Sequence, residues 1–114
     1  MYLKALFLLI LIGISGCRDE SEIVFNEFLS TPIKISAGKQ GKNVVGLKLR
    51  TQGSISSSIE MHIGFEGYVY KTIKIPSSGS YSERFDWYDS PAEISFADTD
   101  ASGQLTLYYH FLIL

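Results

Sequence analysis

The fold class is decided by the stretch Gln104-Leu105-Thr106-Leu107-Tyr108-Tyr109-His110-Phe111-Leu112-Ile113-Leu114. Successive side chains of a β-strand point to opposite faces, so the residues at odd numbers from Leu105 to Ile113 would share one face. The even positions carry Thr106, Tyr108, His110 and Leu112, so the second face is also substantially apolar or aromatic. The pattern therefore predicts a strand in the middle of a sheet.

The same alternation extends outward over most of the chain. Residues 45–50 and 59–65 place their apolar side chains on odd numbers, and shorter runs of this kind cover residues 31–36, 69–75, 82–87 and 93–96. Glycine, proline, serine and aspartate separate these runs at short intervals, as they do between the strands of sandwiches and barrels. We expect an all-β fold, a single antiparallel β-sandwich of about seven or eight strands, with a small closed barrel as the alternative. Residues 23–29 fit a strand or a short helix, and we favour the strand.

The first sixteen residues have a different composition. Residues 1–4 carry one lysine, residues 5–12 are nearly all Leu, Ile and Phe, and residues 13–16 are rich in small side chains. This is the anatomy of a secretory signal peptide. The apolar run is about half of the roughly 20 residues that a membrane-spanning helix needs. The sequence therefore predicts a cleaved signal rather than a transmembrane anchor.

Cys17 is the only cysteine, and it ends the run Ile14-Ser15-Gly16-Cys17. This run resembles the lipobox of bacterial lipoproteins, in which a small residue precedes a cysteine that is acylated before the signal is removed. The resemblance implies a signal peptide at 1–16, a covalent lipid such as palmitate on Cys17, a polar tether at 17–22 and a β-sandwich domain at 23–114. A secretory signal that leaves a free thiol is the alternative interpretation.

The resemblance also implies a location. A lipidated cysteine would hold the domain on a membrane of the cell envelope, facing the periplasm. Arg18 occupies the position where an aspartate tends to retain lipoproteins in the inner membrane, so the outer membrane is favoured over the inner one. Acylation would use the sole cysteine, and one cysteine allows no disulfide within the chain.

Length and charge narrow the classes of function. Removing 16 of 114 residues leaves 98, which is enough for one domain. Without Lys4, nine basic residues face twelve acidic ones, a net charge of −3 with no run of one sign. A nucleic-acid role is disfavoured because phosphate binding needs clustered Lys and Arg. Lys39 and Lys42, in a glycine-rich loop, are more typical of a solvated loop than of a basic site.

Metal and catalytic sites have only partial sequence support. Asp98, Asp100 and Ser102 have the spacing with which calcium loops begin, but the twelfth position, which should be a bidentate glutamate, is Tyr109. His62 and His110 fall on polar strand faces and would be neighbours if their strands paired, but zinc needs three or four ligands. No nucleophile motif or phosphate-binding loop is present. We therefore expect no enzyme activity and no cofactor apart from the lipid on Cys17.

Aromatic residues supply the strongest binding signal. Thirteen of the fifteen lie in the 98 residues after the signal. Phe65, Phe85, Phe96 and Phe111 are core candidates by their parity. The candidate binding residues are Tyr68, Tyr70, Trp87, Tyr88 and Tyr108. Exposed tyrosine and tryptophan are typical of protein interfaces, although tyrosine also sits half-buried in ordinary strands.

These observations favour a small envelope lipoprotein that acts as a non-catalytic protein-interaction module. Its partner would be another envelope protein or an incoming toxin, since immunity lipoproteins have this size and architecture, an analogy of form only. The alternatives are a lipoprotein that binds calcium, a glycan or another small ligand, and an envelope scaffold without a discrete ligand.

Overall fold

The computed structural model describes residues 20–37 and 43–114, and this part of the chain contains eight β-strands. The strands are β1 (Ser21–Phe25), β2 (Ile33–Ile35), β3 (Val44–Ile55), β4 (Ile59–Phe65), β5 (Tyr68–Ile75), β6 (Tyr81–Asp86), β7 (Ala92–Phe96) and β8 (Gly103–Ile113). The predicted signal peptide, residues 17–19 of the predicted tether with Cys17, and the lysines at 39 and 42 lie outside the described residues. No helix in the described part is long and apolar enough to cross a bilayer.

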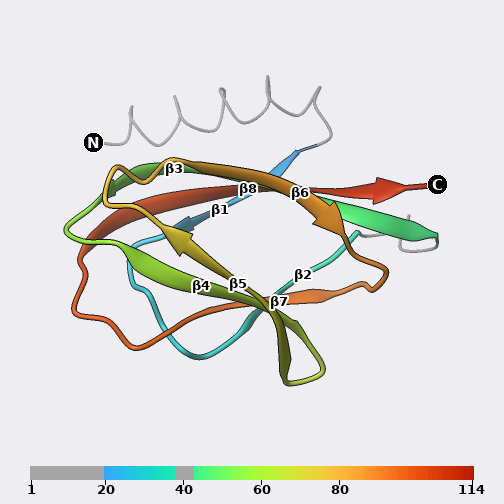
Figure 1. Cartoon of the computed structure of the whole chain (residues 1–114), viewed down its shortest axis with the longest axis horizontal. Helices are drawn as coiled ribbons and strands as arrows, with labels where there is room; N and C mark the ends of the chain where they lie inside the picture. The colour runs from blue at the N-terminus through green and yellow to red at the C-terminus, as the bar shows by residue number, and fades with distance from the viewer. Residues whose placement is uncertain (1–19, 38–42) are drawn as a thin grey trace, which may run out of the picture.

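The strands form two antiparallel sheets that pack face to face (Figure 1). One sheet has the order β1-β8-β3-β6, and the other has the order β2-β7-β4-β5. The predicted all-β sandwich is confirmed, with eight strands. The alternative of a closed barrel is wrong because the strands divide into two separate sheets.

The strand that decided the fold class lies inside its sheet, as predicted. β8 pairs with β3 from Gly103 to Ile113, and with β1 from Leu105 to Tyr109. Leu105 and Leu107 on its inner face are fully buried. On its outer face, Tyr108 and His110 are half-buried because neighbouring strands flank them.

The space between the sheets is filled by aliphatic side chains from the long strands. Leu47 and Leu49 of β3, Met61 and Ile63 of β4 and Ile94 of β7 have no exposed surface. Their alternation with exposed neighbours is what the sequence pattern requires. Of the four predicted core phenylalanines, Phe96 and Phe111 are buried, whereas Phe65 and Phe85 are half-buried and pack against the core.

The ambiguous segment at 23–29 starts as a strand. β1 begins at Ser21, two residues before the predicted domain boundary, and ends at Phe25. The chain then turns so that Phe28 also enters the core, and the rings of Phe25 and Phe28 both contact Phe96 edge-on at centroid distances of 5.0 and 5.3 Å. These contacts pack the β1 edge of the first sheet against β7 of the second sheet.

Candidate functional site

The structure separates the five aromatic residues predicted to bind a partner. Tyr68, Tyr70 and Tyr88 are 69%, 65% and 69% exposed. Trp87 is only 7% exposed, so it belongs to the core and offers almost no surface of its own. Tyr108 is half-buried on the outer face of the other sheet. Three of the five residues therefore have side chains that are available to a partner.

Two of the exposed tyrosines project from the β4–β5 hairpin. The turn is Glu66-Gly67, and both residues have positive φ angles, 51° and 84°, as the favoured two-residue hairpin turns require. Phe65 and Tyr68 pair across the start of the hairpin. The Gly67 amide donates a hydrogen bond to Glu93 Oε1 at 3.1 Å, which ties the turn to β7. The hairpin tip extends beyond the sandwich (Figure 1).

A bulge in β5 sets the position of Tyr70. Ile63 pairs with Lys71 but Gly64 pairs with Val69, so Tyr70 is an extra residue on β5. A side chain at Gly64 would not fit, since its Cβ would lie 2.2 Å from the Tyr68 carbonyl oxygen. Val69 is 54% exposed, so the bulged segment presents an aliphatic side chain between two tyrosines. Alternation alone does not identify Val69 as exposed, because it predicts a regular strand there.

Trp87 forms a buried base for these exposed rings. The Tyr70 ring meets the Trp87 ring edge-on at 6.3 Å, and the Phe85 ring does so at 6.2 Å. The indole Nε1 of Trp87 is buried and has no hydrogen-bond partner among residues 20–37 and 43–114. Tyr88 directly follows Trp87 in the chain. We call the exposed residues Tyr68, Val69, Tyr70 and Tyr88, together with the buried Trp87 that Tyr70 contacts, the aromatic patch.

An ion pair supports the patch where the two sheets meet. The inward-pointing Nζ of Lys71 lies 2.9 Å from Glu83 Oε2 on β6 and 4.9 Å from the centre of the Phe85 ring. The Tyr81 hydroxyl donates a hydrogen bond to the other oxygen of Glu83. These contacts fix β5 against β6, and so hold the two strands that carry the aromatic residues.

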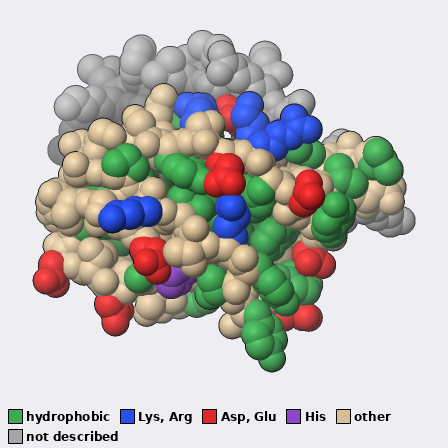
Figure 2. Space-filling view, in the orientation of Figure 1, with side chains coloured by type: hydrophobic (Ala, Val, Ile, Leu, Met, Phe, Trp, Pro, Cys, Tyr) green, Lys and Arg blue, Asp and Glu red, His purple; other side chains and the backbone are tan. Residues whose placement is uncertain are grey.

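The margin of the aromatic patch is acidic. Glu66 precedes the hairpin glycine and Asp89 follows Tyr88, both with exposed side chains. In Figure 2, apolar side chains project at the lower margin with acidic side chains beside them. An apolar centre with a charged rim is the usual composition of a protein interface.

Tyr108 has a different environment. The Arg50 guanidinium lies 4.0 Å above the Tyr108 ring, and Arg50 Nη2 also donates a hydrogen bond to Glu20 Oε1 at 3.1 Å. This cation–π contact covers a face of the ring. The structure therefore assigns Tyr108 to packing on the outer face of its sheet rather than to the aromatic patch.

The two histidines do not come together. His62 lies on β4 and His110 on β8, in different sheets, so the strand pairing that would make them neighbours does not occur. His62 Nε2 instead lies 2.8 Å from Glu60 Oε2 on the same strand. Strand pairing joins residues far apart in sequence, and neither histidine carries a signal that specifies its partner strand.

The loop with Asp98, Asp100 and Ser102 is held by hydrogen bonds within the protein. The Ala101 amide donates to Thr99 Oγ1 at 3.0 Å, and the Ser102 amide donates to Ser56 Oγ at 2.9 Å. Among residues 20–37 and 43–114, no three His, Cys, Asp or Glu side chains are grouped so that they could hold a metal ion. The loop thus gains no ligand from elsewhere in the described fold.

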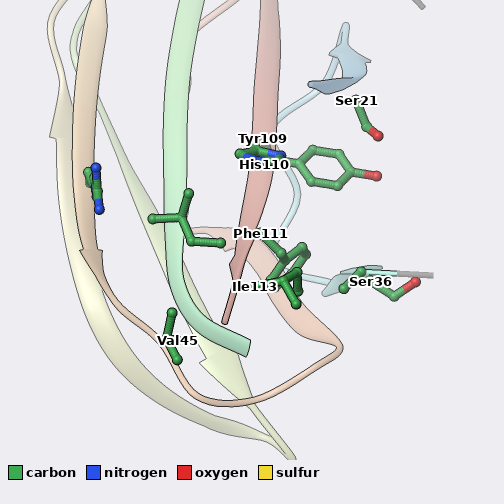
Figure 3. A pocket seen from close by; sticks show the side chains of 10 residues that line it. Ser21, Ser36, Val45, Tyr109, His110, Phe111 and Ile113 are labelled. Atoms are coloured by element: carbon green, nitrogen blue, oxygen red, sulfur yellow. The ribbon is translucent and has the colours of Figure 1, made fainter. Parts of the chain in front are cut away.

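A hollow of about 680 Å³ lies at the end of β8. There β1 no longer pairs with β8, and the lining includes Ser21, Ser36, Arg84, Tyr109 and His110. In Figure 3, Tyr109 and Ser21 lie on the same side of β8, whereas Phe111 and Ile113 lie further along it. Its polar side chains come from β1, β6, β8 and the segment that follows β2.

No protein-family model matches the chain, and no curated protein matches its sequence. Among solved structures, the crystal structure of PirA is similar, with a TM-score of 0.52 and 11% identity over 82% of this chain and 94% of that one. A structure of the Bacillus endospore appendages, a family of disulfide-linked pili, has a TM-score of 0.48 and 11% identity over 83% of this chain and 88% of that one. The likeness to PirA shows a shared fold.

Proposed function

We propose that this protein is a lipid-anchored envelope protein that binds another protein through the aromatic patch, without catalysis. The observation that carries the proposal is the exposure of Tyr68, Tyr70 and Tyr88, each about two-thirds accessible, with the Tyr70 ring packed on the buried Trp87. Tyrosine and tryptophan dominate the energetics of protein interfaces because they bury large areas at little cost in side-chain entropy. An exposed apolar cluster of this kind is unusual for a surface that contacts only water.

The anchor in this proposal is an acyl-modified Cys17 with a palmitate-type chain, on the periplasmic side of the envelope and preferably in the outer membrane. The lipobox resemblance supports it. One acyl chain gives only reversible membrane binding, whereas several chains give stable attachment. The partner would be an envelope protein or an incoming toxin that meets the domain close to the membrane.

The acidic margin narrows the chemistry of the partner. Glu66 and Asp89 are exposed and adjoin the hairpin glycine and Tyr88 in the chain, and complementary charges across an interface raise the association rate and exclude wrong partners. We therefore expect a protein surface with an apolar centre and Lys or Arg at its rim.

Affinity purification of the crosslinked native protein tests this function. We expect one stoichiometric partner, and we expect Tyr68→Ala with Tyr88→Ala to weaken its binding at least about tenfold, since truncated interface hot spots cost about 2 kcal/mol or more. Both side chains are exposed, so the double variant should keep its fold. Trp87→Ala is unsuitable because removing a buried tryptophan destabilises the fold itself.

Tyr108→Ala is the matched control, because it removes a tyrosine from the other sheet. It should leave binding of the partner unchanged. Equal loss in the control and the double variant, or full binding by the double variant, would contradict the aromatic patch as the interface.

Glycan binding is a second candidate, because exposed aromatic rings next to carboxylates also stack on sugars. Titration with envelope oligosaccharides separates it from the first. A saturable heat that disappears in the Tyr68→Ala, Tyr88→Ala variant, with no protein partner recovered, would favour the glycan.

A further inference from the structure

Cationic side chains stand side by side on the outer face of the β1-β8-β3-β6 sheet. The strand register places Lys48 of β3 directly opposite Arg84 of β6 and, on its other side, opposite His110 of β8. Arg50 lies two residues further along β3 and therefore on the same face. Figure 2 shows Lys and Arg side chains gathered along the upper margin, where this sheet lies in Figure 1.

The stability of the fold does not explain this row. Like charges directly opposite each other weaken a strand pair. Lys48 and Arg84 are both exposed, and neither is in a salt bridge with any other described residue. This face also carries three acidic groups: Glu20 pairs with Arg50, Glu22 stands opposite Tyr108, and Asp86 stands opposite Gly46, two residues from Arg84 on β6.

The other sheet shows the ordinary arrangement. Its outward-facing lysines each stand opposite a glutamate, Lys34 opposite Glu93 and Lys74 opposite Glu60. One outer face therefore places each of its lysines opposite a glutamate, whereas the other pairs Arg50 with Glu20 but places Lys48 opposite Arg84. This difference suggests an anionic ligand for the face that carries Lys48 and Arg84.

The chain also enters the domain on this face. Glu20 is held there by its hydrogen bond to Arg50, whose guanidinium is stacked on Tyr108. Cys17 precedes Glu20 by three residues, and three residues span at most about 11 Å. A lipid on Cys17 would therefore keep this face close to the bilayer surface.

We infer that the outer face of the β1-β8-β3-β6 sheet rests on anionic phospholipid headgroups, with Lys48 and Arg84 as its main contacts. The orientation of the domain on the membrane depends on the proposed lipid anchor at Cys17. The affinity of this face for anionic lipid does not depend on that anchor. The β4–β5 hairpin extends from the opposite side of the molecule (Figure 1). The aromatic patch would then point away from the membrane, toward a partner in the periplasm.

Vesicle flotation tests whether this face binds anionic lipid when the protein has no lipid anchor. The full chain carrying Cys17→Ser is mixed with vesicles of phosphatidylglycerol or of phosphatidylcholine at low ionic strength. We expect about tenfold tighter binding to phosphatidylglycerol, and a preference that declines as salt is added, because Lys and Arg near an anionic surface are attracted within a Debye length. Lys48→Gln with Arg84→Gln should lose about tenfold of that binding.

The matched control is Lys34→Gln with Lys74→Gln, which removes the same charge from the other face. It should change binding less than about twofold, since those lysines face away from the bilayer. Thermal melting of each variant confirms that it is folded. Equal binding to both lipids, or equal losses in the two double variants, would overturn the inference and assign the row to another occupant, such as a second copy or a protein.

Orientation is measured in the same Cys17→Ser background, where an added cysteine is the sole thiol. A fluorophore on Gln52→Cys, on the outer face of β3, should be quenched by headgroup-labelled nitroxide lipid, and one on Thr72→Cys of β5 should not. Equal quenching at both positions would also overturn the inference. Mass spectrometry of the native protein reports acylation of Cys17 separately, so a failure of the anchor is distinguishable from a failure of the face.

Discussion

Two glycines allow the chain to cross from one sheet to the other. Gly79, between β5 and β6, has a φ of 78°, and its amide donates a hydrogen bond to the Pro76 carbonyl at 2.8 Å. It lies over Gly53 of β3, and a Cβ on Gly79 would come within 2.5 Å of the Gly53 carbonyl oxygen. The Gly79 carbonyl accepts a buried hydrogen bond from Thr51 Oγ1 at 2.7 Å. Backbone is thus packed on backbone, which only glycine permits.

Gly79→Ala should lower the free energy of unfolding by about 3 kcal/mol or more, because it adds a backbone clash to the strain of a left-handed conformation. Gly67→Ala is the control, since Gly67 also has a positive φ but open space around the position of a Cβ. It should cost only about 1 kcal/mol. Urea titration of both variants measures the difference, and similar losses would show that the close approach to Gly53 does not matter.

At the scale of elements, charged side chains protect the edge strands β5 and β6 from pairing with another chain. β5 is an edge strand, and an unpaired edge invites pairing with another chain. Lys71 points inward from this edge and meets Glu83 of β6. An inward-pointing charge on an edge strand is a known device against such pairing, because a second sheet would bury it. The ion pair is partly exposed, so we expect it to contribute little to stability.

Lys71→Val should therefore promote self-association more than it changes folding. It turns the inner face of β5 into an uninterrupted apolar row and leaves the edge backbone unprotected. Sedimentation velocity over a range of concentrations should reveal dimers or larger species. Lys74→Val, on the outer face of the same strand, is the control and should remain monomeric. A monomeric Lys71→Val protein would show that the edge is protected in another way.

Alternation predicted most of the elements, because burial between two sheets imposes a period of two on each strand. Residues 59–65 form β4 as predicted, and β3 extends the run at 45–50 to Ile55. The sheet partners could not be predicted, as His62 and His110 show.

The exposed tyrosines of the candidate site could be predicted by residue type. The bulge at Tyr70 and the burial of Trp87 could not, because both depend on how two edge strands meet, and no local pattern encodes that contact.

At the scale of the whole molecule, the fold depends on contacts between distant parts of the chain. β1 pairs with β8, so Ser21 faces Tyr109 across 88 positions of sequence, the difference of the two numbers. β3 likewise pairs with β8, with Val44 opposite Ile113. Pairings of this span require long loops to close before any stabilising contact forms.

We therefore expect the domain to fold in milliseconds to seconds, the range of all-β domains with mostly non-local strand pairs. Trp87 is the only tryptophan and is buried, so its fluorescence should report folding in a stopped-flow experiment. Complete folding within microseconds would contradict the expected dependence on β1–β8 and β3–β8 pairing.

The position of β1 has a mechanical consequence. A domain held to a membrane through Glu20 and to a partner through the β4–β5 hairpin would carry tension along the line between them. That tension acts on a five-residue edge strand, and a pull away from the sheet loads the hydrogen bonds of β1 one after another, beginning with the pair of Ser21 and Tyr109. β1 would then separate from β8 one residue pair at a time while β3 and β8 stayed paired. The released strand would lengthen the tether before the rest of the sandwich unfolded.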